Sequence, residues 1–151
     1  MAAEVAETTL ETVVKHITEL NNVGNFRQGA LEHIFEGELN ASNRAVGFHY
    51  EGFPTAKGRA IPGTEITPND LGVYKAKVEV SGVAKISNSG FSSFFPKDWS
   101  PQQVVDAINE AFANKVFSRG NTYIGTTSSG MTIEMYIDST GQIISAFPIY
   151  Y

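Results

Sequence analysis

Alternating apolar and polar positions dominate the last third of the chain. From Met131 to Asp138 every second residue is apolar, which predicts a strand with one buried face. Ser139-Thr140-Gly141 is typical of a turn, and the apolar run after it predicts a partner strand. The segment 121–127, which precedes the Ser128-Ser129-Gly130 turn, predicts a further strand. This part of the chain is therefore expected to form an antiparallel sheet.

A helix is predicted between this region and an earlier strand. Residues 73–80 alternate again, with Tyr74, Ala76, Val78 and Val80 on the side expected to be buried. The helix begins in the phrase Ser100-Pro101-Gln102-Gln103, which offers a capping serine, a proline at the first helical position and a glutamine at the third.

The sequence pattern of the N-terminal part of the chain predicts helices followed by one strand. Apolar residues at helical spacing over 4–20 predict a covering helix within residues 1–24, and Asn25 is expected to cap a second helix through Phe35. Residues 46–51 alternate, which predicts a strand with His49 opposite the aromatic side chains, and 52–71 predict a long loop. The pattern as a whole predicts an α+β fold: N-terminal helices packed with antiparallel β-sheets, one helix inserted between the strand regions, and a single domain over 1–151.

Composition narrows the class of protein. The chain has 151 residues, 42% of them apolar, which suits one globular domain with its own core. It contains no cysteine, so disulfides and zinc–thiolate sites are excluded. The sequence shows no membrane segment and no signal peptide. The net charge of −5 argues against a generic nucleic-acid binder, although eight of the eleven basic residues lie within 51–120.

Two histidines carry the candidate chemistry. His33 lies in the phrase EHIFEGE and His49 in GFHYE, 16 positions apart (49 − 33). Two imidazoles can divide acid–base work near neutral pH, one accepting a proton while the other donates one. Attack of a 2′-hydroxyl on the adjacent phosphodiester needs both transfers. His16 has no comparable phrase around it and is expected to be exposed on the first helix.

These phrases resemble the EndoU family of endoribonucleases, in particular its bacterial, toxin-type nuclease domains. The similarity extends over roughly residues 30–150 and leaves the first helix outside. Besides the two histidine phrases it includes Gly72-Val73-Tyr74, the phrase FFPKDWS over 94–100 and the ending GQIISAFP over 141–148.

The resemblance implies further site residues. A catalytic lysine should follow the histidines, and Lys85 is the first choice because it precedes the S-x-F-F-P phrase, with Lys97 and Lys75 as alternatives. Family members also hold the substrate through hydroxyl groups. The matching positions here are Thr126, Ser128, Ser129 and Tyr136, whereas Phe147 stands where relatives often have tyrosine.

The resemblance also implies an activity. His49 would be the general base, His33 the general acid, although the two roles could be exchanged, and Lys85 would stabilise the transition state. The expected products are 2′,3′-cyclic phosphate and 5′-hydroxyl ends, from tRNA or other single-stranded loops. No cofactor is required and no metal site is expected, with stimulation by Mn²⁺ left open. Expected partners are RNA and, for a toxin domain, an immunity protein.

Several alternatives remain open at this stage. The chain could act in the cytoplasm as a free RNA-processing nuclease, or be delivered into a target cell as part of a larger secreted toxin. It could instead be a non-catalytic binding module, or a histidine enzyme that acts on small phosphate esters.

Overall fold

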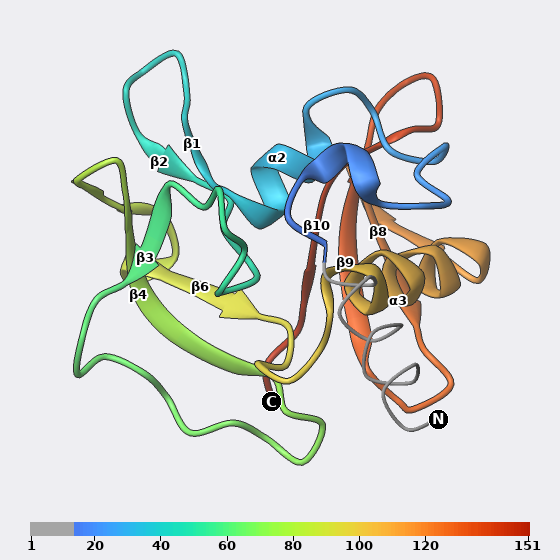
Figure 1. The fold of residues 1–151 in the computed structure, drawn as a ribbon. Helices are drawn as coiled ribbons and strands as arrows, with labels where there is room; N and C mark the ends of the chain where they lie inside the picture. Colours follow the sequence, from blue (N-terminus) through green and yellow to red (C-terminus); the bar gives the residue numbers. More distant parts are fainter. Residues whose placement is uncertain (1–13) are drawn as a thin grey trace, which may run out of the picture.

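The C-terminal strands form one antiparallel sheet in the order β10-β9-β8-β7. Its strands are β7 Val116–Arg119, β8 Thr122–Thr126, β9 Thr132–Ile137 and β10 Ile143–Pro148 (Figure 1). The structure, a computed structural model, describes residues 14–151. The predicted alternation is confirmed, because Met131, Ile133, Met135 and Ile137 are all buried. The opposite face of β9 carries Glu134 and Tyr136, which remain partly exposed.

The middle of the chain forms a second sheet around β4. Its strands are β3 Gly58–Ala60, β4 Tyr74–Val80, β5 Val83–Ala84 and β6 Phe91–Phe94, and β4 pairs with each of the other three. The predicted alternation of β4 is confirmed by the burial of Tyr74, Ala76, Val78 and Val80. The short 3₁₀ helix η2, Ser87–Gly90, leads into β6. Strand β6 lies next to β10, so the two sheets meet there.

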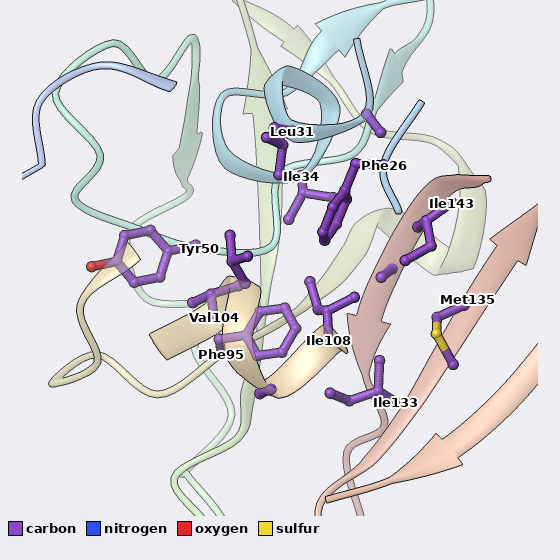
Figure 2. Packing of buried hydrophobic residues seen from close by; sticks show 14 of the residues in the cluster. Phe26, Leu31, Ile34, Tyr50, Phe95, Val104, Ile108, Ile133, Met135 and Ile143 are labelled. Atoms are coloured by element: carbon purple, nitrogen blue, oxygen red, sulfur yellow. The ribbon is translucent and has the colours of Figure 1, made fainter. Parts of the chain in front are cut away.

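Helix α3, Pro101–Ala113, joins the two strand regions as predicted. The Ser100 hydroxyl accepts a hydrogen bond from the amide of Gln103, whose side chain in turn accepts one from the amide of Ser100. This reciprocal cap fixes the start of the helix. Figure 2 shows Ile108 of this helix in the core beside Ile133 of the C-terminal sheet, while Val104 lies on the side of Tyr50. The main core therefore lies between the helices and that sheet.

The front of the chain differs from its prediction. The described part of the first predicted helix contains only the 3₁₀ turn η1, Ile17–Glu19, and residues 4–13 lie outside the described residues. The second helix, α2, spans Ala30–Phe35 instead of starting after Asn25, because Gly29 adopts φ 90° directly before it. Its apolar residues Ala30, Leu31, Ile34 and Phe35 are all buried.

The prediction of a strand over 46–51 is also wrong. Two short strands, β1 Glu38–Leu39 and β2 Ala45–Val46, pair with each other, and β2 ends at Val46. Gly47 and Phe48 then adopt φ of 77° and 72°, which no strand accommodates. The helices and antiparallel sheets together confirm the α+β fold class. Within 14–151 no helix is long and apolar enough to cross a membrane.

Candidate active site

His33 and His49 lie in one cleft, with their ring centroids 6.5 Å apart. The cleft has a volume of about 700 Å³ and lies between the exposed face of the C-terminal sheet and the sheet around β4. Its walls include the following charged and polar residues: His33, His49, Lys75, Lys85, Asn88, Ser92, Ser93, Arg119, Glu134, Tyr136 and Ser145. The separation of the two rings leaves room for a phosphodiester between or beside them.

His33 belongs to the last turn of α2, and a carboxylate holds its ring. Its Nδ1 lies 2.8 Å from Oε2 of Glu38, which follows the helix on β1. A carboxylate can only accept, so Nδ1 carries the proton and Nε2 is left to exchange one with a ligand. The His33 side chain is 19% exposed, so this nitrogen can meet solvent or substrate in the cleft.

Backbone hydrogen bonds bring His49 next to α2. The amides of Phe48 and His49 donate to the carbonyls of His33 and Ile34, at 2.9 and 2.7 Å. The approach is so close at Gly47 that a Cβ there would lie 2.2 Å from the His33 carbonyl oxygen. A glycine with positive φ is therefore required between the two histidine segments.

The ring of His49 is buried and fixed on two sides. Its Nδ1 donates to the carbonyl of Ser93 at 2.9 Å, and its face stacks on Phe147 with centroids 5.1 Å apart. Burial lowers the pKa of His49 well below its ordinary value of 6.5, and the Lys85 ammonium adds to this effect, whereas the bond to Ser93 opposes it. His49 is therefore neutral at pH 7, with an unprotonated Nε2 that can act as a base.

Lys85 follows the last residue of β5 and is also buried. Its Nζ donates to the hydroxyl of Ser92 at 2.9 Å, and that hydroxyl donates to the carbonyl of Gly47 at 3.1 Å. Burial lowers the pKa of Lys85 from 10.5 to about 8. At pH 7 the cleft thus contains a protonated but poorly hydrated ammonium group, whose field acts through less screening than at an open surface.

The charge of the cleft contrasts with that of the whole chain. Its walls carry Lys75, Lys85 and Arg119 against the single carboxylate of Glu134, in a chain whose net charge is −5. The cleft therefore favours an anion. Lys97, one of the alternatives for the catalytic lysine, does not line it and pairs instead with Glu65 at 2.7 Å.

The four predicted substrate-holding hydroxyls do not come together. Tyr136 lines the cleft, where burial raises the pKa of its phenol and keeps it protonated. Thr126, Ser128 and Ser129 do not line it: the amides of Thr126 and Ser128 bond to side chains of α3 and its C-cap, and Ser129 borders a separate hollow beside α3. These three residues lie near the far end of β8, and the cleft involves the opposite end of β9.

Sequence reasoning missed several residues that build the cleft. Glu38 stands five positions after His33, within the phrase EHIFEGE that singled out this histidine. This short spacing could have indicated a carboxylate that hydrogen-bonds to the His33 ring. The adjacent Ser92 and Ser93 hold Lys85 and His49 respectively, but the first uses its hydroxyl and the second its carbonyl. Arg119 was also missed. It is the last residue of β7, whose four residues are all exposed, so no alternation of buried and exposed positions marks this strand in the sequence.

Two histidines that share a cation-lined cleft are suited to acid–base cleavage of a phosphodiester, which is the work of a nuclease. A family model described as bacterial EndoU nuclease matches residues 27–150. The chain belongs to this bacterial EndoU nuclease family.

A curated relative supports the same assignment. A protein of Bacillus cereus named "Toxin" is 53% identical over 132 residues, which make up 87% of this chain and 24% of the relative. The chain thus spans about a quarter of the length of that protein. No solved structure matches the chain significantly.

Proposed function

We propose that this chain is an endoribonuclease that cleaves RNA by intramolecular transphosphorylation. The observation that carries the proposal is the 6.5 Å separation of His33 and His49 in a cleft that also contains Lys85. A buried neutral imidazole, a second imidazole held by a carboxylate and a poorly hydrated ammonium are the three groups that this reaction uses.

In the proposed reaction His49 acts as the base. Its Nε2 accepts the proton of the 2′-hydroxyl while that oxygen attacks the neighbouring phosphorus. His33 Nε2 gives a proton to the departing 5′-oxygen, so the products are a 2′,3′-cyclic phosphate and a 5′-hydroxyl. Lys85 compensates the negative charge that grows on the non-bridging oxygens. The lowered pKa of His49 supports this division of roles.

The test is cleavage of total RNA and of a tRNA fraction by the purified protein, with end-group analysis of the products. We expect 2′,3′-cyclic phosphate ends from RNA and no cleavage of a 2′-O-methyl RNA of the same sequence, because the nucleophile is blocked. Parallel reactions with EDTA and with Mn²⁺ test whether a metal is needed. Within 14–151 no cluster of three or more histidine or carboxylate side chains could hold one.

Substitution separates this activity from a contaminating nuclease. His33→Ala and His49→Ala should each lower the rate by about 10²- to 10⁴-fold, the usual contribution of general acid–base catalysis. His16→Ala is the matched control, since His16 is an exposed histidine outside the cleft. Equal rates for all four proteins, or intact RNA at high protein concentration, would favour the binding-module alternative.

We also propose that the nuclease acts as a toxin domain with RNA, in particular tRNA, as its target and an immunity protein as its natural inhibitor. The support is the B. cereus relative, which is named as a toxin and is about four times longer than the matched segment. Induced expression inside a bacterial cell should stop growth, whereas His49→Ala should not. Normal growth of cells in which the active enzyme is present would contradict the toxin proposal but leave the nuclease proposal standing.

A further inference from the structure

A cation and two aromatic rings stand together in the cleft, in addition to the three proposed catalytic groups. The Nζ of Lys75 lies 5.3 Å from the ring centroid of Phe91 and 5.8 Å from that of Tyr150. All three residues line the same cleft as His33 and His49. The mechanism proposed above uses none of them.

This group lies directly beside the residues that hold His49. Lys75 on β4 is the register partner of Ser93 on β6, and the Ser93 carbonyl accepts the hydrogen bond from His49 Nδ1. Side chains of paired residues are neighbours on one face of a sheet. Tyr150 follows Phe147, which stacks on His49, by three residues. An RNA strand bound at the proposed catalytic groups would therefore reach Lys75 within a short distance.

Tyr150 and the backbone of Lys75 are held in place before any ligand binds. The hydroxyl of Tyr150 donates to the carbonyl of Thr67 at 2.8 Å. The neighbouring Ile66 bridges to the backbone of Lys75, its amide donating at 2.7 Å. Phe91 and Tyr150 are partly buried, which leaves part of each ring open to the cleft. A ring fixed as that of Tyr150 is loses little freedom when a flat group stacks on it.

We propose that Lys75, Phe91 and Tyr150 form a subsite for a nucleotide that flanks the cleaved bond, an inference that rests on the proposed ribonuclease function. Lys75 binds the phosphate of that nucleotide, and an aromatic ring stacks on its base. Single-stranded nucleic acids are bound in this way, through aromatic platforms beside a cationic track. The substrate class is thus single-stranded RNA that continues beyond the cleaved dinucleotide. A base paired in a duplex is not free to stack there.

The kinetic test compares two substrates of random sequence, a mixture of dinucleoside monophosphates and an eight-nucleotide RNA. The wild type should cleave the longer RNA with the higher kcat/KM. Phe91→Leu, which keeps an apolar side chain but removes the ring, should reduce the ratio of the two values about tenfold, the size of one lost base stack. Phe91→Tyr keeps the ring and should preserve the ratio. Thermal melting of each variant verifies that it is folded.

The binding test measures the phosphate contact without cleavage. A fluorescent eight-nucleotide 2′-O-methyl RNA of random sequence is titrated with protein at several salt concentrations. Lys75→Gln should make the plot of log affinity against log salt less steep by about 0.7, as expected for one lost contact to a single strand. Lys77→Gln is the matched control: Lys77 lies on the same strand and near the same ring, but does not line the cleft. It should leave the slope nearly unchanged.

The two tests separate failure of this inference from failure of the proposed function. If the wild type cleaves RNA but Phe91→Leu keeps the substrate ratio and Lys75→Gln matches Lys77→Gln, the subsite is overturned and the nuclease remains. If the wild type cleaves nothing, yet the 2′-O-methyl RNA binds with the expected dependence on Lys75, the nuclease proposal fails and the RNA subsite is supported. If neither cleavage nor binding occurs, both fail.

Discussion

The Lys85 ammonium donates a hydrogen bond of 2.9 Å to the Ser92 hydroxyl, whose own proton goes to the Gly47 carbonyl. The hydroxyl thus presents a lone pair to Lys85, because its single hydrogen is already used. Ser92 is almost fully buried, so water does not replace it easily as an acceptor. It connects the proposed catalytic lysine to the bend that precedes His49.

Ser92→Ala should therefore lower kcat about tenfold with little change in KM, since the Ser92 hydroxyl is used to position the lysine. Loss of the acceptor also disfavours the charged amine, so the pKa of Lys85 should fall further from its ordinary value of 10.5 than the present value of about 8. The alkaline limb of the pH–rate profile should move to lower pH. Thr127→Val is the matched control, a buried hydroxyl that bonds to the Met131 amide outside the cleft. An unchanged profile in Ser92→Ala would reduce this serine to a structural role.

The activity should depend on pH through Lys85. The ammonium acts only when protonated, so the rate should decline as the pH rises through about 8, the pKa of Lys85. At the acid side, the base His49 is lost only when it becomes protonated, well below pH 6.5. Lys85→Arg keeps the positive charge at every accessible pH and should remove the part of the alkaline limb that Lys85 causes, though at a lower maximal rate because the guanidinium is planar and larger. A limb that persists near pH 8 in Lys85→Arg would assign it to another group.

Burial of the same lysine should cost folding stability. The difference between a pKa of about 8 in the folded chain and the ordinary 10.5 corresponds to about 3 kcal/mol as an upper value. The cost is fully present below pH 8, where both states are protonated, and disappears as the pH rises towards 10.5. Lys85→Met should therefore be inactive yet more stable at pH 7 by about 1–3 kcal/mol in urea unfolding. The gain should shrink by pH 9.5, and a Met variant less stable than wild type at pH 7 would contradict it.

Glu38→Gln tests how His33 is held. The amide keeps the shape of the carboxylate but weakens the 2.8 Å bond to Nδ1, and we expect kcat/KM to fall about tenfold. Stability should change by less than about 1 kcal/mol, because Glu38 is about half exposed. Glu65→Gln is the control, since Glu65 pairs with Lys97 outside the cleft. Full activity in Glu38→Gln would mean that the carboxylate does not orient the ring.

Gly47→Ala tests the packing between the two histidine segments. The new Cβ would lie 2.2 Å from the His33 carbonyl oxygen, and the φ of 77° is unfavourable for alanine. We expect a loss of about 2–4 kcal/mol in unfolding free energy, together with loss of cleavage. At Gly52, which also has positive φ (87°), a Cβ would meet nothing within 4 Å. Gly52→Ala should therefore cost only about 1 kcal/mol and leave cleavage intact.

Local signals in the sequence account for the parts of the fold that were predicted well. Helix α3 carries its own cap at Ser100, and β9 has a complete alternation from Met131 to Ile137, so both could be located from neighbouring residues alone. The segment after Val46 shows the limit of such signals. It alternates like a strand, but its amides bond to α2, and these tertiary contacts impose positive φ at Phe48.

The candidate site was predictable where single residues carry rare chemistry. His33 and His49 stood out as a pair, and Lys85 followed from the family resemblance. The substrate-holding hydroxyl groups were harder to predict, because serine and threonine are common in turns. Thr126, Ser128 and Ser129 matched the family's hydroxyl positions along the sequence, but they lie near the far end of β8, outside the cleft. Contributions from a backbone carbonyl, such as that of Ser93, leave no trace in the identity of the side chain.

The backbone bonds from Phe48 and His49 to His33 and Ile34 tie both imidazoles to one short piece of main chain. A shift of α2 must carry the second ring along with the first, so the spacing between the two is conserved even when their common support moves. Substitutions at the rim of the cleft can therefore leave this spacing unchanged, whereas substitutions in the segment that joins the two histidines cannot. Changes on β7, β9 and η2 can alter what the cleft binds, while the two imidazoles keep the same separation.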